Sequence, residues 1–281
     1  MFEPRLFHWI DSGTHTSQPI EPLALDEALA NGMDQPGVFP LVHCWIYERG
    51  LFLGRRDAKL PRLAEALRAT AKRGYSAVLR SSGGACVPLD AGVLNLAFHL
   101  PNRDLPLDDF FRFAAATLQA GLGRYGEITL GAVSGSYCVG DYDFAIKGKK
   151  IGGMAQRRTR RGAILQLCIN VEGSGRERGE LMEHFYRTAG LAEMKETSRP
   201  IPAIDASTIG SLAELVGQAV SVEEVKASLY AAFSRHWRCE QVPFPLPPAA
   251  VEQARAHLQS RLGLFSYTAD QLLRADWRLP D

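Results

Sequence analysis

The sequence predicts an α+β fold in which a mainly antiparallel sheet is flanked by helices and followed by C-terminal helices. Two observations lead to this prediction. β-prone runs follow one another closely and are joined by short turns that contain glycine, as at Lys147–Gly148, which is typical of hairpins. Helical patterns lie between these runs and dominate the chain beyond about Arg176.

The helices are predicted from apolar residues at helical spacing and from signals at their first turns. Asp108 and Asp109 open one of them, where negative charge suits the helix dipole. Ser221 with Glu224 three residues later is a capping-box pattern at the start of another. Helices are therefore expected over residues 22–33, 59–72, 107–122 and 221–237.

The strands are predicted from alternation of apolar and polar residues. The segment 162–173 alternates most regularly, and in 93–100 the leucines and Phe98 face one way while Asn95, Ala97 and His99 face the other. Further strands are expected over residues 41–47, 51–54, 77–80, 142–146 and 149–157. We expect 41–47 and 51–54 to form a hairpin around Arg49–Gly50, and 142–146 to pair with 149–157 through Lys147–Gly148.

The proline-rich span Pro243–Pro248 indicates a linker. It divides the chain into a predicted catalytic domain, residues 22–240, and a C-terminal helical appendage, residues 241–281. The strand-rich half, roughly 41–173, is expected to carry the chemistry.

Composition indicates a soluble enzyme. The 281 residues are 46% hydrophobic and 22% charged, and a net charge of +1 gives no bias toward nucleic acid or anionic membranes. There is no signal layout at the N-terminus and no bilayer-spanning apolar run. Five cysteines, an odd count without a Cys-x-x-Cys pair, argue against a disulfide framework and a zinc site, so we expect reduced thiols, a cytoplasmic location and no metal.

Cys138 is the candidate nucleophile. It lies in a loop of small and polar residues, and the following hairpin folds a lysine-bearing strand back toward it. A nearby ammonium converts a thiol into a reactive thiolate. Strict alternation places Lys150 on one face with Gly152, Met154 and Gln156, so Lys150 is the expected partner of Cys138 and Lys149 is expected at the rim. The alternative is that both lysines are solvated edge residues.

The second informative stretch runs from Arg80 to Asn95 and begins Arg-Ser-Ser-Gly-Gly-Ala-Cys. Gly83 and Gly84 let a backbone approach a ligand closely. Arg80 is suited to orienting a carbonyl or carboxylate, and Asp90 to anchoring the loop. The alternative is a plain glycine-rich turn. It is not a phosphate-binding P-loop, because no lysine follows at the required distance.

The other cysteines and the histidines are weaker candidates. Cys44 and Cys168 lie within predicted strands and are interpreted as packed core thiols, whereas Cys86 borders the glycine-rich loop and Cys239 follows a helix. His43 and His99 are interpreted as hydrogen-bonded core or pocket residues rather than metal ligands, although a Cys–His dyad stays open. The arginine cluster 157–161 is a solvated turn or a docking surface for an acidic partner.

Together these stretches resemble the superfamily of lipoate–protein ligases, octanoyltransferases and biotin–protein ligases. The match covers about residues 23–173. Arg80-Ser-Ser-Gly-Gly-Ala-Cys-Val resembles its acyl-pocket loop, Lys149-Lys150-Ile-Gly-Gly-Met-Ala-Gln156 its lysine strand, and Leu165–Asn170 the strand that follows. Gly135-Ser-Tyr-Cys138 before the lysine strand resembles the Gram-positive octanoyltransferases that use the glycine-cleavage H protein (GcvH).

The resemblance implies an acyltransferase that moves an octanoyl group from an octanoyl-lysine of GcvH to the lipoyl-domain lysine of E2 subunits of 2-oxo-acid dehydrogenases, within protein lipoylation. It implies Cys138 as the thioester nucleophile and Lys150 as the group that lowers the thiol pKa and acts as general acid and base. No cofactor is implied, because an amide is exchanged for an amide. The implied substrate-binding residues are Arg80, Ser82, Gly83, Gly84, Ala85, Asn95, Gly152, Gly153, Met154 and Gln156.

Three alternatives remain at this stage. An octanoyltransferase that uses acyl carrier protein as donor shares the order of cysteine and lysine. An ATP-dependent lipoate–protein ligase needs no nucleophilic cysteine in this loop, so Cys138 argues against it. A binding module with a degenerate site would bind a partner protein without forming a covalent adduct.

Overall fold

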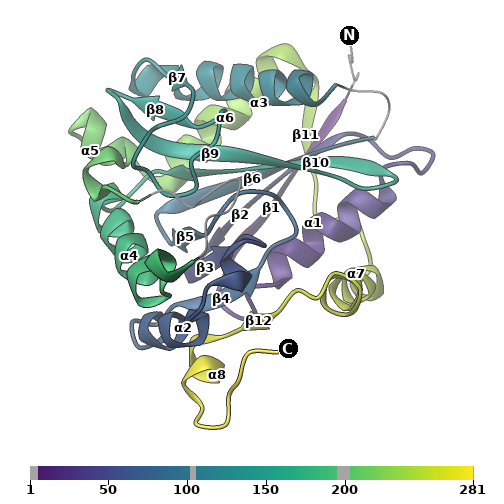
Figure 1. The fold of residues 1–281 in the computed structure, drawn as a ribbon. Coiled ribbons are helices and arrows are strands. Elements are labelled where there is room, and N and C mark those ends of the chain that lie inside the picture. The colour runs from purple at the N-terminus through teal and green to yellow at the C-terminus, as the bar shows by residue number, and fades with distance from the viewer. Residues whose placement is uncertain (1–5, 102–105, 195–202, 281) are drawn as a thin grey trace.

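The computed structural model describes residues 6–101, 106–194 and 203–280, and its strands form two sheets (Figure 1). The larger sheet contains, in spatial order, β11 (Cys239–Gln241), β1 (Phe7–His15), β2 (Leu41–Tyr47), β6 (Val93–Pro101), β10 (Gly162–Asn170), β9 (Lys149–Arg158), β8 (Phe144–Ile146) and β7 (Thr129–Leu130). The smaller sheet contains β12 (Ser266–Tyr267), β4 (Ser76–Leu79), β3 (Arg49–Leu53) and β5 (Val87–Asp90).

Helices cover both sheets. They are α1 (Glu21–Gly32), α2 (Leu63–Ala71), α3 (Leu107–Leu122), α4 (Gly175–Thr188), α5 (Leu212–Val216), α6 (Val222–His236), α7 (Pro248–Ser260) and α8 (Ala269–Leu273). The four predicted helices are confirmed, and the Ser221–Glu224 capping box forms at the start of α6. Across the described residues, no helix combines the length and apolar character needed to cross a bilayer.

The pairing confirms the predicted α+β class with a mainly antiparallel sheet. Among the described residues, β1 pairs in parallel with β2 and β11, and β3 pairs in parallel with β4, while the other strand pairs are antiparallel. The predicted hairpin of β8 and β9 is present. Lys147 and Gly148 both have positive φ, 50° and 75°, as a type I′ turn requires.

The predicted hairpin of residues 41–47 and 51–54 is wrong. β2 lies between β1 and β6 in the larger sheet, whereas β3 lies between β4 and β5 in the smaller one. Both edges of β2 are therefore already paired, and the chain passes from one sheet to the other at Glu48, between Tyr47 of β2 and Arg49 of β3. The ring of Tyr47 packs on Gly50, where an added Cβ would lie 2.8 Å from ring carbons.

The two faces of the central strands separate core from site. Leu96, Phe98 and Leu165 belong to one buried cluster with α3 and α6, which cover one face of the larger sheet (Figure 1). Asn95 and Cys168 are paired across β6 and β10, so they share the opposite face, which the smaller sheet covers. The predicted alternation of 93–100 is confirmed, and the polar face of these strands borders the site.

The C-terminal segment contributes to both sheets. β11 extends the larger sheet along β1, and β12 pairs with β4 of the smaller one. Leu258 of α7 and Leu272 of α8 are buried in the same cluster as the smaller sheet. The described residues of the segment predicted as an appendage, 241–280, thus include elements that pack on the domain that carries the strands.

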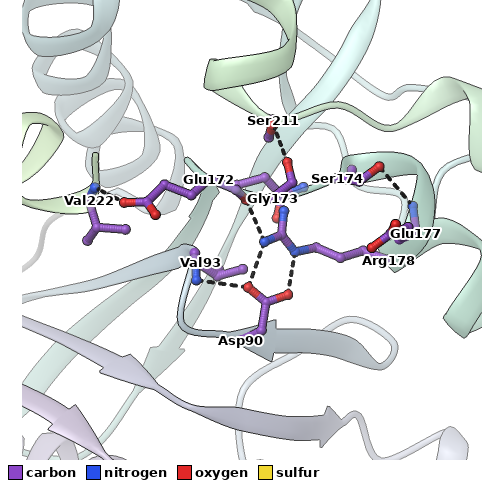
Figure 2. Close-up of polar contacts among 12 residues, drawn as sticks. Asp90, Val93, Glu172, Gly173, Ser174, Glu177, Arg178, Ser211 and Val222 are labelled. Atoms are coloured by element: carbon purple, nitrogen blue, oxygen red, sulfur yellow. Dashed lines mark hydrogen bonds and ion pairs between the residues drawn. The ribbon is translucent and has the colours of Figure 1, made fainter. Parts of the chain in front are cut away.

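Asp90 anchors the turn between β5 and β6, as predicted (Figure 2). The Arg178 guanidinium of α4 donates to both carboxylate oxygens, Nε to Oδ2 at 2.7 Å and Nη2 to Oδ1 at 2.6 Å. Nη2 also donates to the Glu172 carbonyl at 2.7 Å. A Cβ on Gly92 would meet that carbonyl oxygen at 2.7 Å, so the turn leaves room for glycine alone. Arg178 thus joins α4 to one end of the strands that border the site, where β6 begins and β10 has just ended.

Replacing Arg178 with glutamine should lower the free energy of unfolding by about 2 kcal/mol, because the Asp90 carboxylate loses its bidentate partner in a largely buried place. Urea unfolding followed by circular dichroism measures the change. Arg176→Gln on the same helix is the control, since its pair with Glu180 is exposed and should leave the unfolding midpoint unchanged. Equal midpoints for the two variants would show that the Asp90 anchor contributes nothing.

Candidate functional site

An apolar pocket lies between the two sheets. The larger sheet supplies one wall and the smaller sheet the other, with α1 contributing Leu23. Six polar or reactive residues lie close together where the loop after β4 meets the loop before β8: Arg80, Ser82, Tyr137, Cys138, Asp143 and Lys150. The rest of the lining includes Trp45, Phe52, Val87, Leu89, Leu96, Met154, Leu167 and Cys168, with the polar residues Asn95 and Gln166.

Cys138 reaches this pocket in a strained conformation. Its φ is 49°, and among the described residues Lys147 is the other non-glycine with positive φ. Such a conformation costs on the order of 1–3 kcal/mol for a residue other than glycine and persists where surrounding contacts hold it. Gly135, with a φ of 82°, turns the same loop three residues earlier. The loop therefore presents the thiol at the polar end of the pocket.

Three groups of the glycine-rich loop surround the Cys138 sulfur. The Ala85 backbone N–H donates to Sγ at 3.2 Å, and Arg80 Nη2 lies 3.6 Å from the same sulfur. Gly84, with a φ of 96°, lies so close that an added Cβ would be 2.6 Å from Sγ. The two stretches whose residues the resemblance assigns to one site therefore lie in contact in the structure.

Lys150 holds the backbone of the Cys138 loop. Its ammonium donates to the carbonyl oxygens of Tyr137 and Cys138, both at 2.8 Å, and pairs with the Asp143 carboxylate at 2.9 Å. Lys150 and Asp143 are each about 3% exposed. Burial raises the pKa of Asp143 even though the Lys150 charge acts in the opposite direction. The predicted proximity of Lys150 to Cys138 is present, with the contact made to the main chain.

The faces of β9 differ from strict alternation. Phe144 pairs with Gly152 and Ala145 with Lys150, so the register shifts at this point, as in a β-bulge. Gly153, rather than Gly152, then lies beside Lys150: an added Cβ there would be 2.8 Å from Asp143 Oδ1 and 3.6 Å from Lys150 Nζ. A Cβ on Gly152 would strike the Phe144 ring at 2.2 Å. The prediction that Lys150, Gly152, Met154 and Gln156 share a face is wrong for this reason.

The other predicted site residues divide between the pocket and its surroundings. Met154, Gly152 and Asn95 line the pocket, and Asn95 is 5% exposed. Gln156 does not line it, because its amide donates to the Leu107 carbonyl of α3 at 3.1 Å. Lys149 is exposed, in agreement with its predicted place at the rim. Gly83 lies in the loop with open space beside it, since an added Cβ would meet no atom within 4 Å.

Burial disfavours the reactive thiolate form of the remaining cysteines. Burial raises the pKa of the Cys44, Cys86 and Cys168 thiols, and raises that of Cys239 to about 11. Cys44 is a packed core thiol, as predicted, but Cys168 is partly exposed and lines the pocket, so its prediction as a core residue is wrong. Cys86 is fully buried behind the glycine-rich loop.

His43 and His99 are buried and hydrogen-bonded, as predicted. His43 Nδ1 and His99 Nε2 lie 2.8 and 3.1 Å from Asp26 Oδ1, and Gln166 donates to Asp26 Oδ2 at 2.7 Å. Burial opposes ionisation of Asp26, but the bonds to the two histidines outweigh it and lower the carboxyl pKa. Asp26, His43 and His99 offer ligand atoms of the kind that bind metals, all within 4.8 Å of one another. The hydrogen bonds of the two histidines to Asp26 account for this arrangement without an ion.

Sequence reasoning assigned no role to Asp26, Asp143 or Tyr137. Asp26 is a helix residue whose partners lie on strands far along the chain, and no local pattern marks it. The sequence does offer a signal for Asp143, because this acid lies between the Cys138 loop and an apolar strand, where a charged side chain needs a partner. In the arginine cluster, Arg157 pairs with Glu27 and Arg161 with Asp34, so it is partly neutralised by α1 and the turn after it.

The fold and this site define a catalytic domain of the lipoyl protein ligase A/B family. Residues 18–234 match the model of the lipoyl protein ligase A/B catalytic domain, and the chain belongs to that family of enzymes. The resemblance found in the sequence is thus confirmed.

Relatives with defined names match over most of their length. The chain is 38% identical over 215 residues to octanoyl-[GcvH]:protein N-octanoyltransferase of Macrococcus caseolyticus, covering 75% of this chain and 77% of that protein. It is 31% identical over 221 residues to lipoyl-[GcvH]:protein N-lipoyltransferase of Listeria monocytogenes, with 78% of each covered. A solved bipartite lipoate protein ligase of Thermoplasma acidophilum shares the fold, with a TM-score of 0.62, 18% identity and 92% of each chain covered.

Substituting Gly84 with alanine should slow alkylation of Cys138 by iodoacetamide at least several-fold, because the new methyl group would overlap Sγ and Arg80 Nη2 and would hold the backbone at a positive φ. Rates are measured by intact mass spectrometry, with thermal unfolding to confirm that the variant is folded. Gly83→Ala is the matched control, since it meets open space and should react as the parent protein does. An unchanged rate in folded Gly84→Ala would contradict the close packing described.

Proposed function

We propose that this protein is an octanoyltransferase that takes an octanoyl group from an octanoyl-lysine of GcvH and gives it to the lipoyl-domain lysine of an E2 subunit, through a thioester on Cys138. The observation that carries the proposal is the Cys138 sulfur at the polar end of an apolar pocket, in contact with a backbone N–H and a guanidinium. An apolar pocket beside a nucleophilic sulfur suits a straight acyl chain whose carbonyl must be attacked.

In the first half-reaction, the Cys138 thiolate attacks the amide carbonyl of the acylated lysine. A C–S bond forms, the carbonyl oxygen becomes an oxyanion, and backbone N–H groups of Gly83–Gly84 or Gly152–Gly153 are candidates to stabilise it. The C–N bond then breaks as the departing amine takes a proton, for which Lys150 is the proposed donor. The donor lysine leaves as an amine and the octanoyl group stays on Cys138.

In the second half-reaction, the amine of the acceptor lysine attacks the thioester. A C–N bond forms, the C–S bond breaks, and the thiolate of Cys138 returns. The attacking nitrogen loses a proton, which restores the Lys150 ammonium beside Asp143. The bonds made and broken balance over the two halves, and the exchange of one amide for another consumes neither ATP nor metal.

The relatives support GcvH as donor. Proteins named octanoyl-[GcvH]:protein N-octanoyltransferase match at 33–38% identity, which favours octanoyl over lipoyl transfer, the activity in the name of the 31% relative. The acceptor is proposed from the chemistry of protein lipoylation, and a cytoplasmic location from the reduced thiols predicted earlier. Acyl carrier protein as donor and ATP-dependent ligation remain the alternatives that experiment must separate.

Mixing the purified protein with octanoyl-GcvH in the absence of ATP should give one octanoyl adduct, located on Cys138 by intact and peptide mass spectrometry. Adding apo-E2 domain should then transfer the group. Cys138→Ser should abolish both steps, whereas Cys239→Ser, which changes a thiol in β11 outside the pocket, should retain them. An adduct formed from octanoyl-acyl carrier protein alone would reassign the donor, and product formation that depends on ATP would establish a ligase.

Lys150→Ala should reduce octanoyl transfer by at least 100-fold, because the Tyr137 and Cys138 carbonyls lose their shared donor and Asp143 loses its ion pair in a buried place. Single-turnover transfer from octanoyl-GcvH measures the loss. Lys149→Ala changes the exposed neighbour and should retain transfer. If Lys150→Ala is folded and transfers at the parent rate, Lys150 has no part in the reaction.

A further inference from the structure

We infer that Arg80, and not Lys150, is the cation that directly stabilises the Cys138 thiolate, with the Ala85 N–H as its hydrogen-bonding companion. The inference rests on the proposed role of Cys138 as nucleophile, and assigns Arg80 a catalytic contact in addition to its predicted place in the substrate pocket. Lys150, in this assignment, does not stabilise the thiolate: its ammonium fixes the loop on which Cys138 stands and carries the proton that the departing amine takes.

The first argument is that the three N–H groups of the resting Lys150 ammonium are all bonded elsewhere, so none is left for the Cys138 sulfur. An ammonium has three N–H bonds, and Lys150 has three acceptors: the carbonyl oxygens of Tyr137 and Cys138 and the carboxylate of Asp143. Its positive charge is also balanced, because Asp143 is an equally buried counterion at 2.9 Å. A neutral pair of this kind stabilises a neighbouring anion much less than an isolated cation does.

The second argument is that the Arg80 guanidinium has no carboxylate of its own. Arg80 is 7% exposed, and among the described residues no carboxylate oxygen lies within 4.0 Å of it. Its neutral acceptors are Ser82 Oγ and the Ala85 carbonyl oxygen, both at 2.8 Å, and its buried Nε–H has no partner within the described part of the chain. A guanidinium stays charged at neutral pH, so this buried charge is not paired with a carboxylate in direct contact.

The third argument is that the Cys138 sulfur lies where a negative charge would balance the Arg80 guanidinium. Arg80 Nη2 lies 3.6 Å from Sγ, and the Ala85 N–H donates to Sγ at 3.2 Å. A thiolate accepts from both donors, while a thiol offers them a weak acceptor. Gly84 permits this approach, because a Cβ there would come within 2.7 Å of Arg80 Nη2.

The other titratable groups near the site fit the same balance. Asp57 is buried and acts electrostatically on Arg80, but its own oxygens accept from the Gly54 N–H and the Tyr186 hydroxyl. The nearby thiols of Cys86 and Cys168 stay protonated because burial raises their pKa. Because the charges of Lys150 and Asp143 cancel, Arg80 is, among the described residues in contact with Cys138 Sγ, the cation that can offset a thiolate.

The test is the pH dependence of Cys138 alkylation by iodoacetamide, read by mass spectrometry, with Cys138→Ser as background. Arg80→Gln should move the midpoint of this profile upward by about one pH unit or more, since an opposite charge within about 4–6 Å lowers an acid's pKa by one to three units. Arg80→Lys keeps the charge and should recover part of the shift. Thermal unfolding confirms that each variant is folded.

Two matched variants separate charge from packing. Ser82→Ala removes a hydrogen bond of Arg80 but keeps the guanidinium, so the alkylation midpoint should stay in place. The double variant Lys150→Gln with Asp143→Asn removes the ion pair as a neutral unit and should move the midpoint less than Arg80→Gln does. A purely structural role of Arg80 would lower the rate at every pH and leave the midpoint unchanged.

An unchanged midpoint in folded Arg80→Gln, or a larger shift in the double variant, would overturn the inference and return the role to Lys150. Should the double variant not fold, the comparison of Arg80→Gln with Arg80→Lys and Ser82→Ala decides alone. Alkylation needs neither acyl donor nor acceptor. A shifted midpoint without octanoyl transfer would therefore refute the proposed function alone, and transfer with an unmoved midpoint would refute the inference alone.

Discussion

The buried ion pair of Lys150 and Asp143, with the two carbonyl oxygens that the ammonium also binds, is the interaction on which the site depends. It ties the loop before β8 to β9, and so fixes Cys138 in a left-handed conformation that this residue would not keep unaided. The register shift in β9 makes this possible, because it brings Gly153 beside the pair and leaves space for both side chains. Local strain at Cys138 is thus supported by a buried electrostatic contact a few residues along the chain.

The two sheets surround that local arrangement with an apolar pocket. The larger sheet presents the loop of Cys138, and the smaller sheet presents the glycine-rich loop that carries Arg80 and Ala85. The sheets face each other across the pocket, so both loops reach the Cys138 thiol. The Asp90–Arg178 ion pair joins the turn between β5 and β6 to α4 (Figure 2). Two cations lie in the site. Asp143 neutralises the Lys150 ammonium, which holds the backbone of the Cys138 loop. Among the described residues, no carboxylate lies within 4.0 Å of the Arg80 guanidinium, which lies against the Cys138 sulfur.

The resemblance in sequence was a strong guide to the class of enzyme because its motifs are short, ordered and rich in glycine. Such motifs record close backbone approaches, and the structure shows the approaches they record, at Gly84 against Sγ and at Gly153 against Asp143. The resemblance was a weaker guide to the contacts that each charged group makes. It paired Cys138 with Lys150, and the two residues do meet, but through the main chain.

The sequence by itself determined the α+β class, the main helices, the β8–β9 hairpin and the two loops that meet at the site, because periodicity, capping and turn chemistry are local properties. Tertiary structure alone decided that 41–47 and 51–54 belong to different sheets, since strand partners are chosen by long-range pairing. It also decided that Gln156 turns toward α3, because a one-residue shift in β9 is invisible to alternation. Cys168 borders the pocket because its face of β10 lies toward the cluster of the smaller sheet. The partners of Asp26 and Arg178 were likewise settled by the packing of segments distant in the chain, which no spacing along the chain encodes.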